Sequence, residues 1–354
     1  MGERSVTIRD VAAAAGVSTA TVSRTLDPDG SGGVSEKTRL RVFAAAAGIG
    51  YRTNLAARSL KTRSTRTVGI VAPELANNFF MDLAEGIEKE LSAKGYTLLV
   101  ASSDNSVEGE KKRVAMLADR MVDGIVVIPA GSRGEHLSSL HTGGIPVVLV
   151  DRLVEGTRID AILSDNEAGA RSLTAKLLED GFRRIVFVGG DKAVSTARER
   201  MAGFKAAMKA AGIRLNRDSF RLGGMEVEDG FAHMDVILKS GRPPEALVAV
   251  NLLVHLGMER RLLARFPGRR TEGYMPVIAA FDESDYTPFL PACRYTVAQD
   301  TASMGKEAVR RILERIARRK KGGNGFQEEQ FQTGNTEPQI IRLPVTILKH
   351  FQDR

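Results

Sequence analysis

The 354-residue sequence predicts a two-part protein, with an N-terminal all-α helix-turn-helix headpiece and an α/β core of two doubly wound parallel-sheet lobes. Two short helical stretches separated by a glycine turn stand near the N-terminus, and positive charge is concentrated in the first 66 residues. From residue 68 onward, short apolar runs alternate with amphipathic stretches. Such alternation is typical of α/β folds, whereas the helical start is typical of a separate small domain.

The first helix is delimited by residues suited to helix ends. Thr7 and Asp10 stand at capping-box spacing, good helix formers occupy 12–15, and Gly16 suits a helix C-terminus. A second helix is expected about two residues later, with Ser18 as its N-cap. Two short helices joined by a glycine-containing turn form a helix-turn-helix, whose second helix enters the major groove of DNA.

A third helix completes the headpiece. The glycines and the proline in 26–33 prevent a continuous helix, and Ser35 is expected to cap the next one. Its apolar face at helical spacing would consist of Val42, Phe43, Ala46 and Ala47. The rest of the small core would come from Val11, Val17 and Val22.

The charge distribution favours nucleic acid as a partner. The chain has a net charge of +8, and residues 1–66 hold eleven Lys and Arg against five Asp and Glu. An excess concentrated on a helix-turn-helix is the electrostatic footprint of a phosphate-binding surface.

Several other classes are disfavoured. No apolar run approaches the roughly 20 residues of a membrane span, and the N-terminus is charged where a signal peptide is apolar, so a cytoplasmic protein is expected. Cys293, the single cysteine, cannot form an internal disulfide. No metal or other cofactor is expected, since metal-ligand spacing is absent among His136, His141, His233, His255 and His350.

The core is divided by its apolar runs. Runs of this kind are strands buried on both faces, and they occupy 68–72, 97–101, 124–129, 146–150, 185–189, 246–250 and 277–281. Two lobes with a ligand cleft at the carboxyl ends of the strands are expected. The predicted divisions are 1–53 for the headpiece, 54–67 for a hinge helix and linker, 68–164 with about 297–324 for the first lobe, and 165–296 with about 325–350 for the second.

The chain resembles one family over roughly residues 6–345. The resemblance is carried by TIRDVAAAAGVSTATVSRTL, VSEKTRLRVFAAAAGIGYRTNLAARSL, TVGIVAP, VDGIVVIPA, IPVVLVDR, SDNEAGA, RERMAGF and VIAAFDES, which follow in order. All look like the LacI/GalR (lactose-repressor/galactose-repressor) transcription factors. The resemblance implies a homodimer that grips near-palindromic double-stranded operator DNA, and a periplasmic-binding-protein-like core that holds a small effector.

The same resemblance assigns DNA contacts. Thr19 and Ala20 would read base edges, and Arg24 would reach a guanine or a phosphate. In the hinge, Leu60 would wedge into the minor groove, on a helix too short to be stable without DNA. The remaining contacts, to phosphates or as helix caps, would come from Thr7, Ser18, Thr21, Ser23, Asn54, Arg58 and Lys61.

For the effector, the resemblance points to separated segments that converge on the cleft. Phe79 and Phe80 would stack on a ring. The less favoured alternatives are that Phe79 is a core residue and that Asp151 and Arg152 pair with each other. The full expected set is Phe79, Phe80, Asp151, Arg152, Thr196, Arg200, Asn251, Asp282 and Gln299. Aspartates and arginines of this kind are the usual polar groups for a carbohydrate.

Some questions stay open at the level of the sequence. Asn251 is followed by Leu252 where many relatives have Asn-Asp, and NLLVHLG is closer to the fructose-repressor branch, which adds sugar phosphates to sugars as candidate effectors. A sugar-binding transport protein and an enzyme are the alternatives from other classes. An enzyme is disfavoured because GxSxG, HExxH, P-loop and GxGxxG motifs are all absent from the sequence. A repressor is favoured over an activator, and inducer and corepressor are not distinguished.

Overall fold

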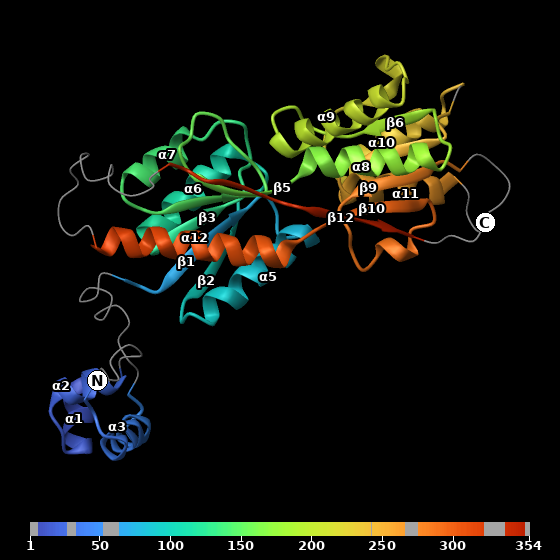
Figure 1. The fold of residues 1–354 in the computed structure, drawn as a ribbon. Helices are drawn as coiled ribbons and strands as arrows, with labels where there is room; N and C mark the ends of the chain where they lie inside the picture. The colour runs from blue at the N-terminus through green and yellow to red at the C-terminus, as the bar shows by residue number, and fades with distance from the viewer. Residues whose placement is uncertain are drawn as a thin grey trace. The chain divides into compact units, whose positions relative to one another are not determined.

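The computed structural model describes residues 6–26, 33–51, 64–241, 243–265, 275–321 and 337–350, which belong to two compact units divided between Thr65 and Arg66 (Figure 1). The hinge residues named above, Asn54, Arg58, Leu60 and Lys61, lie outside the described residues. No helix in the described part of the chain is long and apolar enough to cross a membrane.

The headpiece unit contains α1 (Ile8–Ala15), α2 (Thr19–Leu26) and α3 (Glu36–Gly48). The predicted ends of α1 are confirmed. The Asp10 carboxylate accepts hydrogen bonds from the backbone N–H (2.8 Å) and hydroxyl (2.7 Å) of Thr7, and Gly16 ends the helix at φ 60°. A left-handed C-terminal residue of this kind favours glycine.

The headpiece core differs from the sequence prediction in its α3 residues. Val11, Val22 and Val42 are fully buried, with Val17 half-buried beside them, as expected. The inclusion of Phe43 and Ala47 was wrong, because both are exposed. These two positions are turned by about 100° from those at 42 and 46 on the helix surface. The Phe43 ring lies instead under the guanidinium of Arg39, at 5.8 Å from its centroid.

The first lobe of the core is a six-stranded parallel sheet in the order β11-β5-β4-β3-β1-β2 (Figure 1). Its strands are β1 (Thr67–Ala72), β2 (Thr97–Ser102), β3 (Gly124–Val127), β4 (Val147–Val150), β5 (Asp160–Ser164) and β11 (Ile340–Leu343). Its helices are α5 (Asn78–Ser92), α6 (Val107–Asp119), α7 (Glu135–Thr142) and α12 (Thr301–Lys321). α5 and α12 share one buried cluster with the sheet, and α6 and α7 share another, so helices cover both faces.

The second lobe has the order β12-β10-β9-β8-β6-β7, and only β12 runs antiparallel to its neighbour among the described strands. Its strands are β6 (Ile185–Val188), β7 (Phe220–Arg221), β8 (Ala246–Ala249), β9 (Val277–Phe281), β10 (Cys293–Gln299) and β12 (Val345–Lys349). Its helices are α8 (Asn166–Glu179), α9 (Ser195–Ala210), α10 (Val227–Leu238) and α11 (Leu252–Arg265), with short 3-10 turns at Arg217–Ser219 and Thr287–Phe289.

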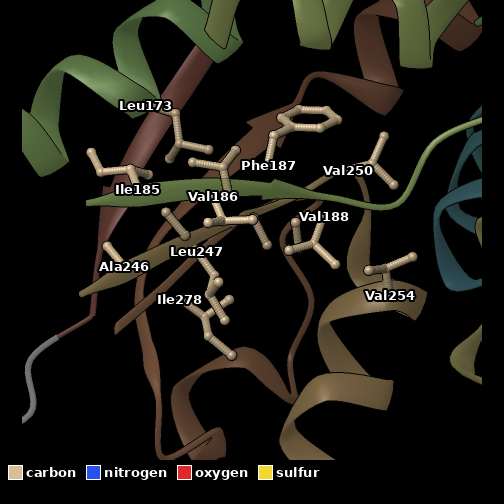
Figure 2. Close-up of a cluster of buried hydrophobic side chains, with 14 of the residues drawn as sticks. Leu173, Ile185, Val186, Phe187, Val188, Ala246, Leu247, Val250, Val254 and Ile278 are labelled. Carbon is tan, nitrogen blue, oxygen red and sulfur yellow. The ribbon is translucent and has the colours of Figure 1, made fainter. Parts of the chain in front are cut away.

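The predicted doubly wound architecture is confirmed, because each of the seven apolar runs contains a strand. In the second lobe, side chains of β6 project to both faces of the sheet, with Leu173 of α8 and Val254 of α11 among their neighbours (Figure 2). One part of the expected division differs from the structure. β11 lies within 325–350, which was assigned to the second lobe, yet it pairs with β5 in the first. Its side chains are alternately exposed, so it has no continuous apolar run.

Candidate functional site

The exposed surface of α2 carries the residues predicted to read DNA. The hydroxyl of Ser18 accepts a hydrogen bond from the backbone N–H of Thr21 at 3.1 Å, so the predicted N-cap is confirmed. Thr19, Ala20 and Arg24 are exposed, whereas Val22 packs inward. A hydroxyl, a methyl group and a guanidinium are therefore exposed to solvent on one short helix.

The other predicted headpiece residues are less free to contact DNA. Ser23 and Thr21 are half-buried, and the hydroxyl of Thr21 lies 2.9 Å from that of Ser18. The Thr7 hydroxyl donates to Asp10, as described above. The hydroxyls of Thr7 and Thr21 serve the local helix ends, which fits a positioning role better than base readout.

In the core, the predicted effector residues follow the carboxyl ends of strands or begin helices. Asp151 and Arg152 follow β4, Asn251 follows β8, Asp282 follows β9, and Gln299 ends β10. The other predicted residues lie near the N-terminal ends of α5 and α9: Phe79, Phe80, Thr196 and Arg200. All except Gln299 are buried.

Arg200 is the centre of one polar group. Its Nε donates to Oδ1 of Asn166 and its Nη1 to the carbonyl of Val250, both at 2.8 Å. Its Nη2 lies 3.7 Å from Oδ1 of Asp282, which also accepts from Nε2 of Gln299 at 2.5 Å. Arg200 thus pairs electrostatically with Asp282, which is held by the hydrogen bond from Gln299.

Asp151 and Arg152 form a second polar group. Nε of Arg152 lies 3.7 Å from Oδ2 of Asp151, so the two side chains pair electrostatically without a hydrogen bond. Nη1 of Arg152 donates to the carbonyl of Pro129 at 3.2 Å, and its guanidinium lies 5.5 Å from the ring centroid of Phe80. Burial raises the pKa of Asp151 to about 6, against the opposing effect of Arg152 and Arg200. That influence shows that the two polar groups share one electrostatic environment.

Two predicted residues have structural roles of their own. Oδ1 of Asn251 accepts from the backbone N–H of Val254, and its Nδ2 donates to the carbonyl of Met225, both at 2.9 Å. The Phe79 ring meets Phe80 edge-on at 5.5 Å and belongs to the first-lobe core cluster. The open alternative for Phe79, a core residue, is therefore consistent with its packing.

Residues that join the two lobes escaped the sequence reasoning. The hydroxyl of Ser195, at the start of α9, accepts from the backbone N–H of Leu153 at 2.8 Å. Nδ2 of Asn105 donates to Oε1 of Glu226 at 3.4 Å. Burial raises the pKa of Glu226, with Glu74 adding to the effect. Since these contacts join distant parts of the chain, spacing in the sequence carries no signal for them.

Buried polar atoms remain available at this site. Oδ1 of Asp151, Nε of Arg152 and Oε1 of Gln299 have no hydrogen-bond partner among the described residues. Each unsatisfied buried group costs about 1–3 kcal/mol. The set contains a donor, Nε of Arg152, and two acceptors, Oδ1 of Asp151 and Oε1 of Gln299. The described residues contain no cluster of His, Cys, Asp or Glu suited to a metal ion.

Known families match both units. A family model described as bacterial regulatory proteins, lacI family, matches residues 7–54. A second, described as periplasmic binding proteins and sugar binding domain of LacI family, matches residues 65–324.

Individual relatives match most of the chain. The HTH-type transcriptional repressor PurR of Vibrio parahaemolyticus is 32% identical over 311 residues, which cover 88% of this chain and 92% of that protein. The HTH-type transcriptional regulator RegA of Clostridium saccharobutylicum is 30% identical over 307 residues, covering 86% and 91%. The Lac repressor bound to ONPG has a TM-score of 0.78 at 25% identity, covering 98% of this chain and 99% of the repressor.

These relatives are regulators of transcription, so family membership also confirms the prediction that the chain is not an enzyme. The predicted fold and family are confirmed together. The chain belongs to the LacI family of bacterial transcriptional regulators, with a DNA-binding headpiece and a ligand-binding core.

Proposed function

We propose that the chain is a cytoplasmic repressor that binds a near-palindromic operator as a homodimer and responds to a carbohydrate effector held between the core lobes. Relatives named as repressors support this, and two solved structures of similar fold bear on the core. One is the CelR–cellobiose complex, at 28% identity and a TM-score of 0.66. The other is Cra of Pseudomonas putida with fructose 1-phosphate, which at 24% identity supports the fold alone.

The observation that carries the effector proposal is the set of unpaired polar atoms contributed by both lobes. Asp151 and Arg152 follow a strand of the first lobe, and Gln299 ends a strand of the second. A ligand that satisfies all three groups contacts both lobes at once. Its binding free energy therefore depends on the angle between the lobes, which is the requirement for control of DNA binding.

The charges favour an uncharged sugar over a sugar phosphate. The two carboxylates Asp151 and Asp282 balance the two guanidiniums of the site, and one of these, Arg200, already has three acceptors around it. Glu226 lies close enough to Arg152 for the two charges to influence each other. A phosphate would enter a site with little positive charge to spare, whereas hydroxyl groups would find both donors and acceptors.

The DNA part of the proposal is tested by selection from a random-sequence duplex library with the full-length protein. We expect enrichment of one near-palindromic sequence, with Thr19, Ala20 and Arg24 as the base-reading residues. Enrichment of a site without two-fold symmetry would contradict the homodimer, and no enrichment would contradict sequence-specific binding.

The effector part is tested by thermal shift with neutral monosaccharides, cellobiose and other disaccharides, and the phosphate esters of the same sugars. We expect a neutral sugar to raise the melting temperature, and the shift to disappear in Gln299→Ala. As a matched control, Gln339→Ala changes a glutamine outside the site, on the strand-start side of the first lobe, and should leave the shift intact. A shift produced only by phosphate esters would contradict the neutral-sugar proposal.

A further inference from the structure

Exposed basic residues gather at the edge of the first lobe where its parallel strands begin. Lys94 follows α5, Arg120 follows α6, and Arg158 precedes β5, all exposed. α12 ends at the same edge in four consecutive basic residues, 318–321. We call the exposed side chains of Lys94, Arg120, Arg158, Arg318 and Arg319 the basic edge.

Contacts within the lobe fix the end of α12 at this position. Nε of Arg315 donates to Oδ2 of Asp160, the first residue of β5, at 2.7 Å. Ile312 and Ile316 pack against Gly124, the first residue of β3, so closely that a side chain at Gly124 would come within 2.8 Å of Ile312. Figure 1 draws the C-terminal end of α12 and the start of β1 at the same end of the lobe.

The basic edge is not neutralised by its described neighbours. None of its five side chains makes an ion pair with a residue that the structure describes. Asp160 is buried and already bound by Arg315, and Asp123 is buried beside the backbone of Arg66. Exposed carboxylates at this edge are Asp119, the last residue of α6, and Glu337, which precedes β11.

The positive charge of the basic edge exceeds the partial negative charge of the helix C-termini at the same edge. The C-termini of α5, α6, α7 and α12 meet here, and each has a partial charge of about −0.5, or about −2 together. The basic edge has five formal positive charges. The core as a whole is nearly balanced, because subtracting the first 66 residues from the chain totals leaves 40 Lys and Arg, the basic edge included, against 38 Asp and Glu.

The chain enters the core at this edge. Residues 52–65 connect the headpiece to β1, whose first residue, Thr67, is in register with Thr97 at the start of β2. The DNA-binding unit is thus joined to the core at the side of the first lobe that carries the basic edge. We propose that the basic edge binds the phosphate backbone of duplex DNA that flanks the site held by the headpiece. This inference rests on DNA binding by the headpiece.

The test compares full-length proteins on mixed-sequence duplexes of two lengths, about 20 and 60 base pairs, with the affinity measured as a function of salt. Arg120→Gln, Arg158→Gln, Arg318→Gln and Arg319→Gln are combined in one variant. We expect its plot of log affinity against log salt on the long duplex to be shallower by roughly 0.9 per phosphate contact removed. On the short duplex, which lacks flanks, the slope should match that of the wild type.

Two matched variants separate the edge from net charge and from folding. Lys192→Gln, Lys209→Gln, Arg214→Gln and Arg217→Gln remove the same charge from exposed positions of the second lobe and should leave both slopes unchanged. Replacing the four arginines of the basic edge by lysine keeps the charge and should retain the wild-type slope. Equal slopes for wild type and the glutamine variant on the long duplex would overturn the proposal. Failure of the wild type to bind either duplex would instead overturn DNA binding by the headpiece.

Discussion

The carboxyl group of Asp151 combines deep burial with one oxygen that has no partner. Oδ2 faces Arg152 at 3.7 Å, and Oδ1 is unsatisfied among the described residues. Burial raises the pKa of this carboxyl from 3.8 to about 6. The residue holds this position with φ 66°, a left-handed conformation that is uncommon outside glycine. A polar residue under such strain is typical of a functional site.

The raised pKa predicts a pH dependence that Asp151→Asn removes. Between about pH 4 and pH 6 the native state retains a proton that the unfolded state has lost, so the free energy of unfolding falls as the pH rises. Above pH 6 the loss of unfolding free energy caused by the buried, ionised carboxyl reaches its full size, on the order of 3 kcal/mol for a pKa shift from 3.8 to about 6. Relative to wild type, Asp151→Asn should therefore gain melting temperature across this window.

Circular dichroism melts at intervals from pH 4 to 7.5 check this prediction. Asp285→Asn is the matched control, since its carboxyl is exposed in the same core, and it should follow the wild-type curve. Parallel curves for wild type and Asp151→Asn would show that the buried carboxyl is not the source of the pH dependence.

At the scale of elements, continuous burial made several strands predictable, but not all: β5 is buried throughout and was missed, whereas β2 was found although Leu99 and Val100 are exposed. β3, β4, β8 and β9 are buried throughout, and each was found from an apolar run. β11 and β12 were not, because each buries only alternate side chains and depends on a distant partner strand.

The residues of the candidate site also differ in how far the sequence could predict them. The resemblance assigned Asp151 and Asp282, and both directly follow predicted strands, where ligands of α/β sheets bind. Glu226 and Ser195 could not, since their partners lie in the other lobe. Phe43 was assigned to the wrong face of its helix because an apolar residue next to a buried position satisfies a loose helical pattern.

Close packing of α10 on α11 predicts opposite effects for two helical glycines. A Cβ at Gly257 would lie 1.9 Å from the carbonyl oxygen of Val227 and 2.7 Å from the backbone nitrogen of Phe231. Since both are backbone atoms, the helices must separate, and Gly257→Ala should reduce the free energy of unfolding by about 1–3 kcal/mol or more. Gly48 in α3 has nothing within 4 Å of the same atom, so Gly48→Ala should stabilise the headpiece by up to about 1 kcal/mol.

Urea unfolding followed by circular dichroism measures both changes. Ser substituted at Gly257 should be at least as destabilising as Ala, because the obstruction begins at Cβ. A Gly257→Ala protein with the midpoint of the wild type would contradict the close approach of the two helices.

At the scale of the whole molecule, the headpiece and the core are two compact units, each with its own hydrophobic clusters. Four valines and a few alanines and other apolar residues hold the headpiece together, whereas each core lobe has its own clusters around a sheet. After β5 the chain passes into the second lobe, α12 returns it to the first, and β11 and β12 place consecutive strands in different sheets. A change in the angle between lobes therefore bends several connecting segments together, which suits a transition between discrete states.

The division into units predicts that DNA binding and effector response can be lost separately. Arg24→Ala removes an exposed side chain from α2 and should weaken the selected operator by about 1–3 kcal/mol per half-site, while effector affinity measured by calorimetry stays unchanged. Gln299→Ala should leave operator affinity without effector unchanged and abolish the response to the sugar found by thermal shift. In the wild type that response should lie between about 5- and 150-fold, the range of a coupling free energy of 1–3 kcal/mol. Because the two residues belong to different compact units, the double variant should lose operator affinity by as much as Arg24→Ala and should lack the effector response as Gln299→Ala does. Loss of effector affinity in Arg24→Ala, or of effector-free operator affinity in Gln299→Ala, would show that the two sites are not separable in this way.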